Sequence, residues 1–360
     1  MITVYDSLNG PEADVCDSSQ GSPLEADWRR LYAISPDATP YQSIDYVRAA
    51  LALCDGAPHI IAWQSKGGKI TGAQAIFPCW IDRKGTLRFV ADAHTDFCGP
   101  LVDPSCAGGY HLCEELAEHI LATPQIRRVR LENIRSRLFQ SGLQYHLKGC
   151  VLFGYRKYSV MKVPAIGGAK SAIDALAHLS TKEKYRLKNI ASKMDAAGVD
   201  FRLFDSNEAW PAELIGTLTQ SMVAAGIRKP EYFSPGFLDF LKGVYDAGLM
   251  VVCATFRDGT PLACNLLLRG GASGELIDWI ALYDDPVSNG WNLLQCIRWV
   301  SAQGGGTLNF ARGVYMYKMH NYRPALYDLD RLRWSRSRLG RLADLLGCLV
   351  EQSKRSRRSR

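Results

Sequence analysis

The sequence has no apolar run long enough to cross a membrane and no recognisable targeting segment. Hydrophobic residues make up 47% of the 360 residues, yet no stretch approaches the roughly 18 consecutive apolar residues that a membrane helix requires. The first residues, Met1 to Asp6, lack a basic segment followed by an apolar one, so we expect no signal peptide. These absences predict a cytoplasmic protein and leave open a peripheral location at the inner face of the cell membrane.

Paired cysteines and clustered histidines are also absent. None of the 11 cysteines forms a Cys-x-x-Cys motif, and several lie in apolar runs, as Cys150 and Cys253 do. This usage is typical of reduced, buried thiols. The seven histidines show no zinc-ligand spacing. His111, Glu115 and His119 share one helix face, which an ordinary amphipathic helix explains, so we expect no metal ion.

The net charge of +7 is concentrated at one end of the chain. Residues 331–360 carry ten basic side chains against Asp344 and Glu351, a net charge of +8, and the remaining residues therefore carry −1. The main body is not a basic nucleic-acid binder, so DNA is an unlikely partner.

The length and the order of predicted elements indicate two α+β domains of related shape. Apolar periodicity and turn signals predict helices at residues 41–54, 110–122, 180–193, 208–224, 235–247 and 292–303. They predict strands at residues 58–64, 70–81, 87–91, 127–132, 150–163, 199–204, 250–257, 261–269, 276–283, 307–310 and 326–334. We divide the chain into a loosely ordered segment (1–27), an N-terminal domain (28–160), a C-terminal domain (161–335) and a tail (336–360).

Four segments of the second half carry a family resemblance. They are a basic helix at 182–189, a hairpin around Asp258-Gly259, a strand-to-helix segment containing Ser288-Asn289-Gly290, and residues 310–318. In order and spacing they resemble the acetyltransferase-like family of cellulose and exopolysaccharide biosynthesis operons. That family is related to the Fem-type aminoacyltransferases and belongs to the GNAT superfamily. The chain departs from it at Asn309 and Ala311, where an acid and a glycine are usual, and at Asn289, where proline is usual.

The resemblance implies two tandem GNAT-like domains, each with a mixed, mainly antiparallel twisted sheet flanked by helices. It implies acetyl-CoA as the acyl donor, held in the C-terminal domain between two strands that part to admit a pantetheine arm. A helix start suits a pyrophosphate because its N–H groups are unpaired. The predicted cofactor-binding residues are Ser288, Asn289, Gly290, Trp291, Asn292 and Arg312. The alternative is an ordinary capped strand-to-helix loop.

Three residues are candidates for proton transfer. Asp278 interrupts an apolar strand and is a candidate to take a proton from the amine; the alternative is a strand position on the solvent face. In the superfamily a tyrosine often returns a proton to the thiolate, and Tyr283 and Tyr317 are the candidates; packing is their alternative.

Basic side chains supply the candidates for anion binding. Lys318, like Arg312, is a candidate to bind phosphate groups. Lys184 and Arg186 on the basic helix are candidates to bind an anionic acceptor, either a polyprenyl-phosphate sugar or tRNA. The alternative for all of them is ordinary solvation. Residues 97–101 resemble part of an acceptor cleft, so we expect the first half to shape the acceptor site without a second cofactor.

The tail has leucines at helical spacing between residues 339 and 350, followed by a basic run at 354–360. This pattern favours an anionic membrane surface as a partner. Packing on the body and a solubilising end are alternatives, and an anionic regulatory nucleotide is a further one without a supporting motif.

The predicted function is N-acylation of an amino sugar, or of its lipid- or nucleotide-linked form, in exopolysaccharide biosynthesis. The alternatives are a Fem-like enzyme using aminoacyl-tRNA and a non-catalytic GNAT-fold module.

Overall fold

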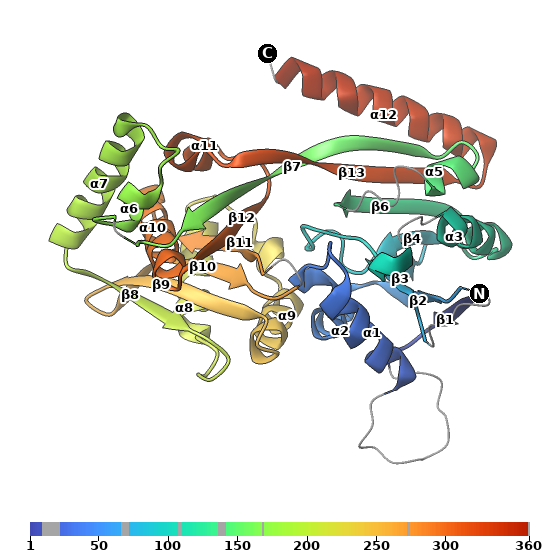
Figure 1. The fold of residues 1–360 in the computed structure, drawn as a ribbon, viewed down its shortest axis with the longest axis horizontal. Helices are drawn as coiled ribbons and strands as arrows, with labels where there is room; N and C mark the ends of the chain where they lie inside the picture. Colours follow the sequence, from blue (N-terminus) through green and yellow to red (C-terminus); the bar gives the residue numbers. More distant parts are fainter. Residues whose placement is uncertain are drawn as a thin grey trace. The chain divides into compact units, whose positions relative to one another are not determined.

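The chain folds into two compact units (Figure 1). The computed structural model describes residues 1–8, 22–65, 72–106, 110–135, 142–167, 169–271 and 274–358. Unit 1 comprises Met1–Arg156, Gly271–Ser273 and Asp328–Arg360, and unit 2 comprises Lys157–Gly270 and Gly274–Tyr327.

Unit 1 contains a mixed sheet in which the strand order is β1-β2-β3-β4-β6-β13. Neighbouring strands are antiparallel except β4 and β6, which run parallel through Thr86–Arg128 and Leu87–Val129. The strands are β1 (Ile2–Tyr5), β2 (Gly56–Trp63), β3 (Ala75–Asp82), β4 (Thr86–Phe89), β6 (Arg128–Ile134) and β13 (Ala325–Ser335), with the short β5 (Leu101–Val102) paired to β3. The helices are α1 (Pro23–Ile34), α2 (Ile44–Ala50), α3 (Tyr110–Ala122), α5 (Leu143–His146), α12 (Arg338–Arg358) and the 3-10 turns Pro40–Gln42, Leu51–Leu53 and Pro104–Cys106.

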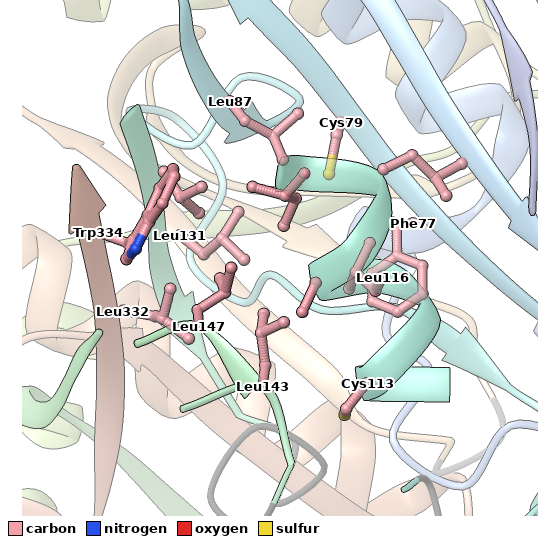
Figure 2. Close-up of a cluster of buried hydrophobic side chains, with 14 of the residues drawn as sticks. Phe77, Cys79, Leu87, Cys113, Leu116, Leu131, Leu143, Leu147, Leu332 and Trp334 are labelled. Carbon is pink, nitrogen blue, oxygen red and sulfur yellow. The ribbon is translucent and has the colours of Figure 1, made fainter. Parts of the chain in front are cut away.

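The core of unit 1 lies between its sheet and α3 (Figure 2). Phe77 and Cys79 from β3 point toward Leu116 from α3, and Trp334 from β13 closes the other side. Each of these side chains is at most 2% exposed. Burying a large apolar side chain stabilises the fold by about 1.5–3 kcal/mol, so this cluster fixes β13 as a member of unit 1.

Unit 2 has the same strand topology. Its sheet has the order β8-β9-β10-β11-β12-β7, antiparallel throughout except for the parallel pair β11 and β12. The strands are β7 (Val151–Pro164), β8 (Val199–Phe204), β9 (Met250–Arg257), β10 (Thr260–Leu268), β11 (Leu276–Tyr283) and β12 (Gly305–Arg312). The helices are α6 (Ala172–Ala175), α7 (Thr181–Ala196), α8 (Ala212–Ala224), α9 (Pro235–Asp246), α10 (Pro286–Ala302), α11 (Met316–Tyr322) and the 3-10 turn Pro230–Phe233.

The predicted fold class is confirmed, because each unit is a mixed, mainly antiparallel sheet flanked by helices. The unit boundaries differ from the sequence division at two strands. Residue 160 lies inside β7, whose last residues belong to unit 2, and Asp328–Ser335 of β13 belong to unit 1. The sixth strand of each sheet is therefore supplied by chain from the opposite half of the sequence, which a pattern of apolar residues does not reveal.

Local sequence signals explain where several helices begin. The side chain of Ser180 accepts from the N–H of Glu183, whose carboxylate accepts from the N–H of Ser180 at 2.8 Å, a complete capping box for α7. Ser22 caps α1 with proline at its first position. Within residues 1–27, expected to be loosely ordered apart from the short apolar start, that start forms β1 and residues from Pro23 onward belong to α1, whereas residues 9–21 lie outside the described residues.

Three further observations bear on the chemical class of the protein. No described helix is both long and apolar enough to span a membrane. Within the described residues, no three His, Cys, Asp or Glu side chains gather as metal ligands. Ten cysteines are described; all carry thiols outside disulfides, and eight are buried.

Candidate functional site

The parallel strands β11 and β12 part soon after they begin. Among the described residues they pair at Leu276–Leu308 and Ile277–Asn309, whereas β11 continues to Tyr283 and β12 to Arg312. A cavity of about 260 Å³ lies where they separate. Its walls come from β11, β12, α11 and the end of α8: Met222, Ile227, Arg228, Asp278, Trp279, Ala281, Tyr283, Phe310, Ala311, Arg312, Tyr315, Tyr317 and Lys318.

A bulge in β12 accompanies the separation. Ala311 has φ +59°, in the left-handed region, and the register of β12 against β7 shifts between Asn309 and Arg312. The Asn309 side chain holds this shape, because its oxygen accepts from the N–H of Ala311 at 3.0 Å and its amide donates to Glu275 at 3.1 Å. The departures at Asn309 and Ala311 therefore occur at residues that form the bulge beside the cavity.

Lys318 brings a buried positive charge to the cavity wall. Its ammonium donates to Asp278 Oδ2 at 2.9 Å and to the carbonyl of Phe310 at 3.2 Å, and the two side chains are 6% and 1% exposed. Burial opposes the charged form, but the charge and hydrogen bond of Asp278, together with Tyr317 and Tyr315, outweigh it and raise the pKa of Lys318 above its ordinary value. Lys318 is thus a cation at neutral pH and cannot act as a general base.

A chain of buried polar side chains fixes Asp278. Its second oxygen accepts from Asn265 at 2.7 Å, and Asn265 in turn accepts from Asn292 at 2.6 Å. Asn292 then accepts from Thr255 at 2.7 Å. As whole residues, Asp278 is 2% exposed and the other three are 0% exposed, so the predicted alternative of a solvent-facing Asp278 is wrong. Both carboxylate oxygens are engaged, and the chain holds Lys318 in one position.

The predicted cofactor loop is part of a helix. Because Asp285 is the N-cap and Pro286 the first residue, α10 begins six residues before the predicted residue 292. The Asp285 carboxylate accepts from the N–H groups of Val287 at 2.6 Å and Ser288 at 3.2 Å, and the Ser288 hydroxyl also donates to it. Although partial burial opposes it, these hydrogen bonds lower the pKa of Asp285. A negative charge therefore already occupies the start of α10.

The other residues predicted to bind the cofactor pyrophosphate are buried within α10, where they make internal contacts. Trp291 donates to Asp195 at 3.2 Å, the carbonyl of Gly290 accepts from Tyr322 at 3.3 Å, and Asn292 belongs to the polar chain. Ser288 and Asn289 are each 2% exposed. The segment expected to lie between a strand and a helix is thus part of the first turns of α10.

Tyr283, Tyr317 and Arg312 do lie together at the cavity, as members of its wall. Burial raises the pKa of Tyr317, against the opposing effect of the Lys318 charge. Tyr317 is therefore a protonated hydroxyl at neutral pH and can donate a hydrogen bond or a proton.

Lys184 and Arg186 do not line this cavity. Lys184 donates to the carbonyl of Asp174 at 3.1 Å, and Arg186 donates to the carbonyl of His320 at 3.0 Å. Both tie α7 to neighbouring segments of unit 2. Residues 97–101, the predicted part of an acceptor cleft, contain Phe97 and Leu101, which are fully buried in unit 1.

Sequence reasoning missed Asn265 and Tyr315. Asn265 interrupts an apolar strand just as Asp278 does, and that shared irregularity on two neighbouring strands was the available signal. Tyr315 had no such signal, because it is the N-cap residue of α11, a helix of only seven residues. Its ring lies 5.5 Å from the Lys318 ammonium, within reach of a cation–π contact.

Comparison of folds gives the protein's structural relatives. The C-terminal domain of a putative lysylphosphatidylglycerol synthetase from Agrobacterium fabrum matches with a TM-score of 0.59 and 12% identity, covering 92% of this chain and 96% of that one. L-PGS from Bacillus licheniformis gives 0.54 and 15% identity over 82% and 92%. FemX gives 0.60 and 10% identity over 86% and 95%.

These likenesses show a GNAT-type fold and, at such low identity, the fold alone. No protein-family model matches the sequence, and a search of curated proteins finds no match.

Proposed function

We propose that this chain is an acyltransferase that works in the cavity between β11 and β12 and takes its acyl group from an aminoacyl-tRNA. The observation that carries the proposal is the parted strand pair with the buried Lys318 ammonium at its wall. Acyl transfer develops negative charge on the carbonyl oxygen of the donor. A fixed positive charge in a site of low dielectric stabilises that oxygen at the moment of reaction.

Five residues of the cavity wall have roles in this scheme. The acceptor nucleophile attacks the ester carbonyl, the C–O bond to the ribose breaks, and Lys318 stabilises the oxyanion between these events. Asp278 is a positioning residue that orients Lys318, in place of the base expected from its sequence context. Tyr317 or Tyr283 protonates the departing ribose oxygen and regains its proton from the acceptor nucleophile. Arg312 pairs with a phosphate at the tRNA end.

The start of α10 favours this donor over coenzyme A. A helix start binds a pyrophosphate through its unpaired N–H groups, but Asp285 already accepts from those of Val287 and Ser288. A second anion there would meet a carboxylate at close range. Lysylphosphatidylglycerol synthetases, which by name make a lysyl ester of a phospholipid, share the fold, and the Fem-type resemblance implies aminoacyl-tRNA as donor.

The second candidate is acetylation of an amino sugar, or of its lipid- or nucleotide-linked form in exopolysaccharide synthesis, from acetyl-CoA. The same opening between β11 and β12 supports it, because the resemblance puts a pantetheine arm there. The two candidates share Lys318 and differ in the donor, so the donor is what an experiment must identify.

The test supplies both donors to the purified full chain. One reaction contains a mixed pool of radiolabelled aminoacyl-tRNAs and the other radiolabelled acetyl-CoA, each with phosphatidylglycerol vesicles or glucosamine as acceptor. We expect label to move from tRNA and not from acetyl-CoA. The charge-removing variant Lys318→Met/Asp278→Asn is expected to lose at least about 100-fold in rate, the usual scale for an oxyanion-stabilising group.

A matched control uses the exposed ion pair of Lys242 and Asp246 on α9 in the same unit. Lys242→Met/Asp246→Asn removes the same two charges away from the cavity and should leave the rate unchanged. Transfer from acetyl-CoA alone would replace the proposal by the second candidate. Transfer from neither donor to either acceptor would favour the non-catalytic module.

A further inference from the structure

Helix α12 is attached to unit 1 by its polar face. Asp344, which is 4% exposed, accepts from Arg130 at 2.5 Å and from Ser335 at 2.8 Å. Two turns further on, Glu351 accepts from Arg331 at 2.8 Å and from Arg333 at 2.7 Å. Figure 1 shows α12 running alongside β13, which carries three of these partners. Ion pairs and hydrogen bonds therefore orient this helix.

The opposite face of α12 is apolar and points to solvent. A surface helix normally turns its apolar stripe toward the core, and α12 reverses that rule. The members of the stripe are between 46% and 82% exposed: Leu339, Leu342, Leu345, Leu346, Leu349 and Val350. A continuous exposed stripe of this kind marks an interaction surface.

The charge around the stripe selects its partner. Residues 331–360 carry a net charge of +8, and their two acids, Asp344 and Glu351, are engaged on the inward face. Arg338 is exposed at the start of the helix, and the sequence continues past Glu351 with Lys354, Arg355, Arg357, Arg358 and Arg360. The stripe is therefore bordered by positive charge. Two copies of this surface would repel each other, whereas an anionic lipid surface attracts it.

We propose that α12 is a membrane-docking helix, which inserts its leucine stripe into an anionic bilayer surface while its acidic face stays bound to unit 1. Such a helix lies in the plane of the interface, with apolar side chains among the lipid chains and basic residues at the headgroups. The proposal is independent of the donor and of the chemistry in unit 2. Membrane binding would bury the exposed leucine stripe and bring the folded protein to the membrane surface.

Vesicle flotation of the full chain tests the proposal. The probes are phosphatidylcholine vesicles with and without phosphatidylserine, an anionic lipid distinct from the phosphatidylglycerol used as an acceptor. Wild type is expected to float with the anionic vesicles and to be released by high salt. Leu346→Glu should lower the vesicle affinity at least about tenfold, because burying one leucine contributes more than that factor.

Two controls keep the outcome specific. Leu121→Glu changes a leucine of similar exposure, 48% against 54% for Leu346, at the end of α3 and should float as wild type does. Lys318→Met/Asp278→Asn should also float, which separates docking from catalysis. The proposal is overturned if wild type ignores anionic vesicles or if Leu121→Glu loses as much affinity as Leu346→Glu. Self-association that Leu346→Glu abolishes, without vesicle binding, would assign the stripe to a second copy.

Discussion

The two units share one topology but use the space beside their parallel strands differently. In unit 1 the segment after β4 fills that space: the N–H of Cys98 donates to the carbonyl of Asn133 at 2.9 Å, and Phe97 is fully buried. Asn133, with φ +58°, donates to the carbonyls of Asp92 at 3.0 Å and Thr95 at 2.7 Å. In unit 2 the left-handed residue of the corresponding strand, β12, is Ala311, and an open cavity remains.

The comparison shows that the fold provides the opening between the two strands, whereas the residues around that opening decide whether it can hold a ligand. A strand pair that opens, with a left-handed residue beyond it, occurs in both units. In unit 1 the segment after β4 fills the opening, and the side-chain amide of Asn133 donates to two carbonyls of that segment. The opening in unit 2 remains a cavity, and Lys318, Tyr283 and Tyr317 line its wall. We therefore assign the chemistry to unit 2.

The largest expected effect comes from breaking the buried charge pair in unit 2. Lys318→Met should lower the free energy of unfolding by about 3–5 kcal/mol, because it leaves the Asp278 carboxylate buried and unpaired. Adding Asp278→Asn should restore most of that loss. Urea denaturation of the two variants measures the effect. A single variant as stable as wild type would show that Asp278 is not a paired buried charge.

The counterpart in unit 1 is the segment after β4, which fills the opening and which Asn133 holds through hydrogen bonds to Asp92 and Thr95. Asn133→Ala removes the hydrogen bonds that the side chain donates to the carbonyls of Asp92 and Thr95 and the one that it accepts from Tyr155. It should cost about 2–4 kcal/mol, since the two buried carbonyls lose this donor. Hydrogen exchange should rise in β6 and leave β11 unchanged. Asn207→Ala in an exposed turn is the control and should change neither strand.

Lowering the pH should destabilise unit 1 more than unit 2, because unit 1 contains a half-buried histidine pair. His59 of β2 and His119 of α3 lie 3.0 Å apart through their Nε2 atoms, and burial together with the charge of His119 lowers the pKa of His59 to about 4. The unfolded chain, with a histidine pKa near 6.5, then binds more protons than the folded one between pH 6.5 and about 4.

The stability from His59 is therefore complete above pH 6.5 and is lost as the pH falls toward 4. After allowance for partial exposure this amounts to about 1–2 kcal/mol. Hydrogen exchange of β2 at pH 7 and pH 5 measures it, and His59→Gln should flatten the dependence. An equal acid response in β9 would refute the assignment to this pair.

The smallest expected effect concerns the left-handed position in unit 2. Ala311→Gly should raise the free energy of unfolding by less than about 1 kcal/mol, because glycine adopts a positive φ without the steric cost that alanine bears. Ala281→Gly, in an extended strand of the same cavity wall, should instead lower it by about 0.5–1 kcal/mol. Thermal unfolding compares them, and equal shifts would contradict the strain at Ala311.

The sequence predicted individual elements well. Residues 199–204, 250–257 and 276–283 coincide with β8, β9 and β11, because apolar runs bounded by turn residues define them. It did not predict which sheet β13 joins, because strand patterns carry no partner information. It singled out Asp278 and Lys318 separately, 40 residues apart, and their pairing appears in the folded chain. Apolar spacing places the start of α10 at residue 292, six residues late, because it does not register the N-cap Asp285 and the proline that follows it.

The exchange of β7 and β13 sets an order of assembly during synthesis on the ribosome. Unit 2 has all of its chain once Tyr327 has emerged, whereas the open edge of β6 waits for Asp328–Ser335. The unit that is translated first is thus the last to be completed. Until then its unpaired strand edge invites misassociation, so a nascent chain stalled near residue 327 should be the most chaperone-dependent form of this protein.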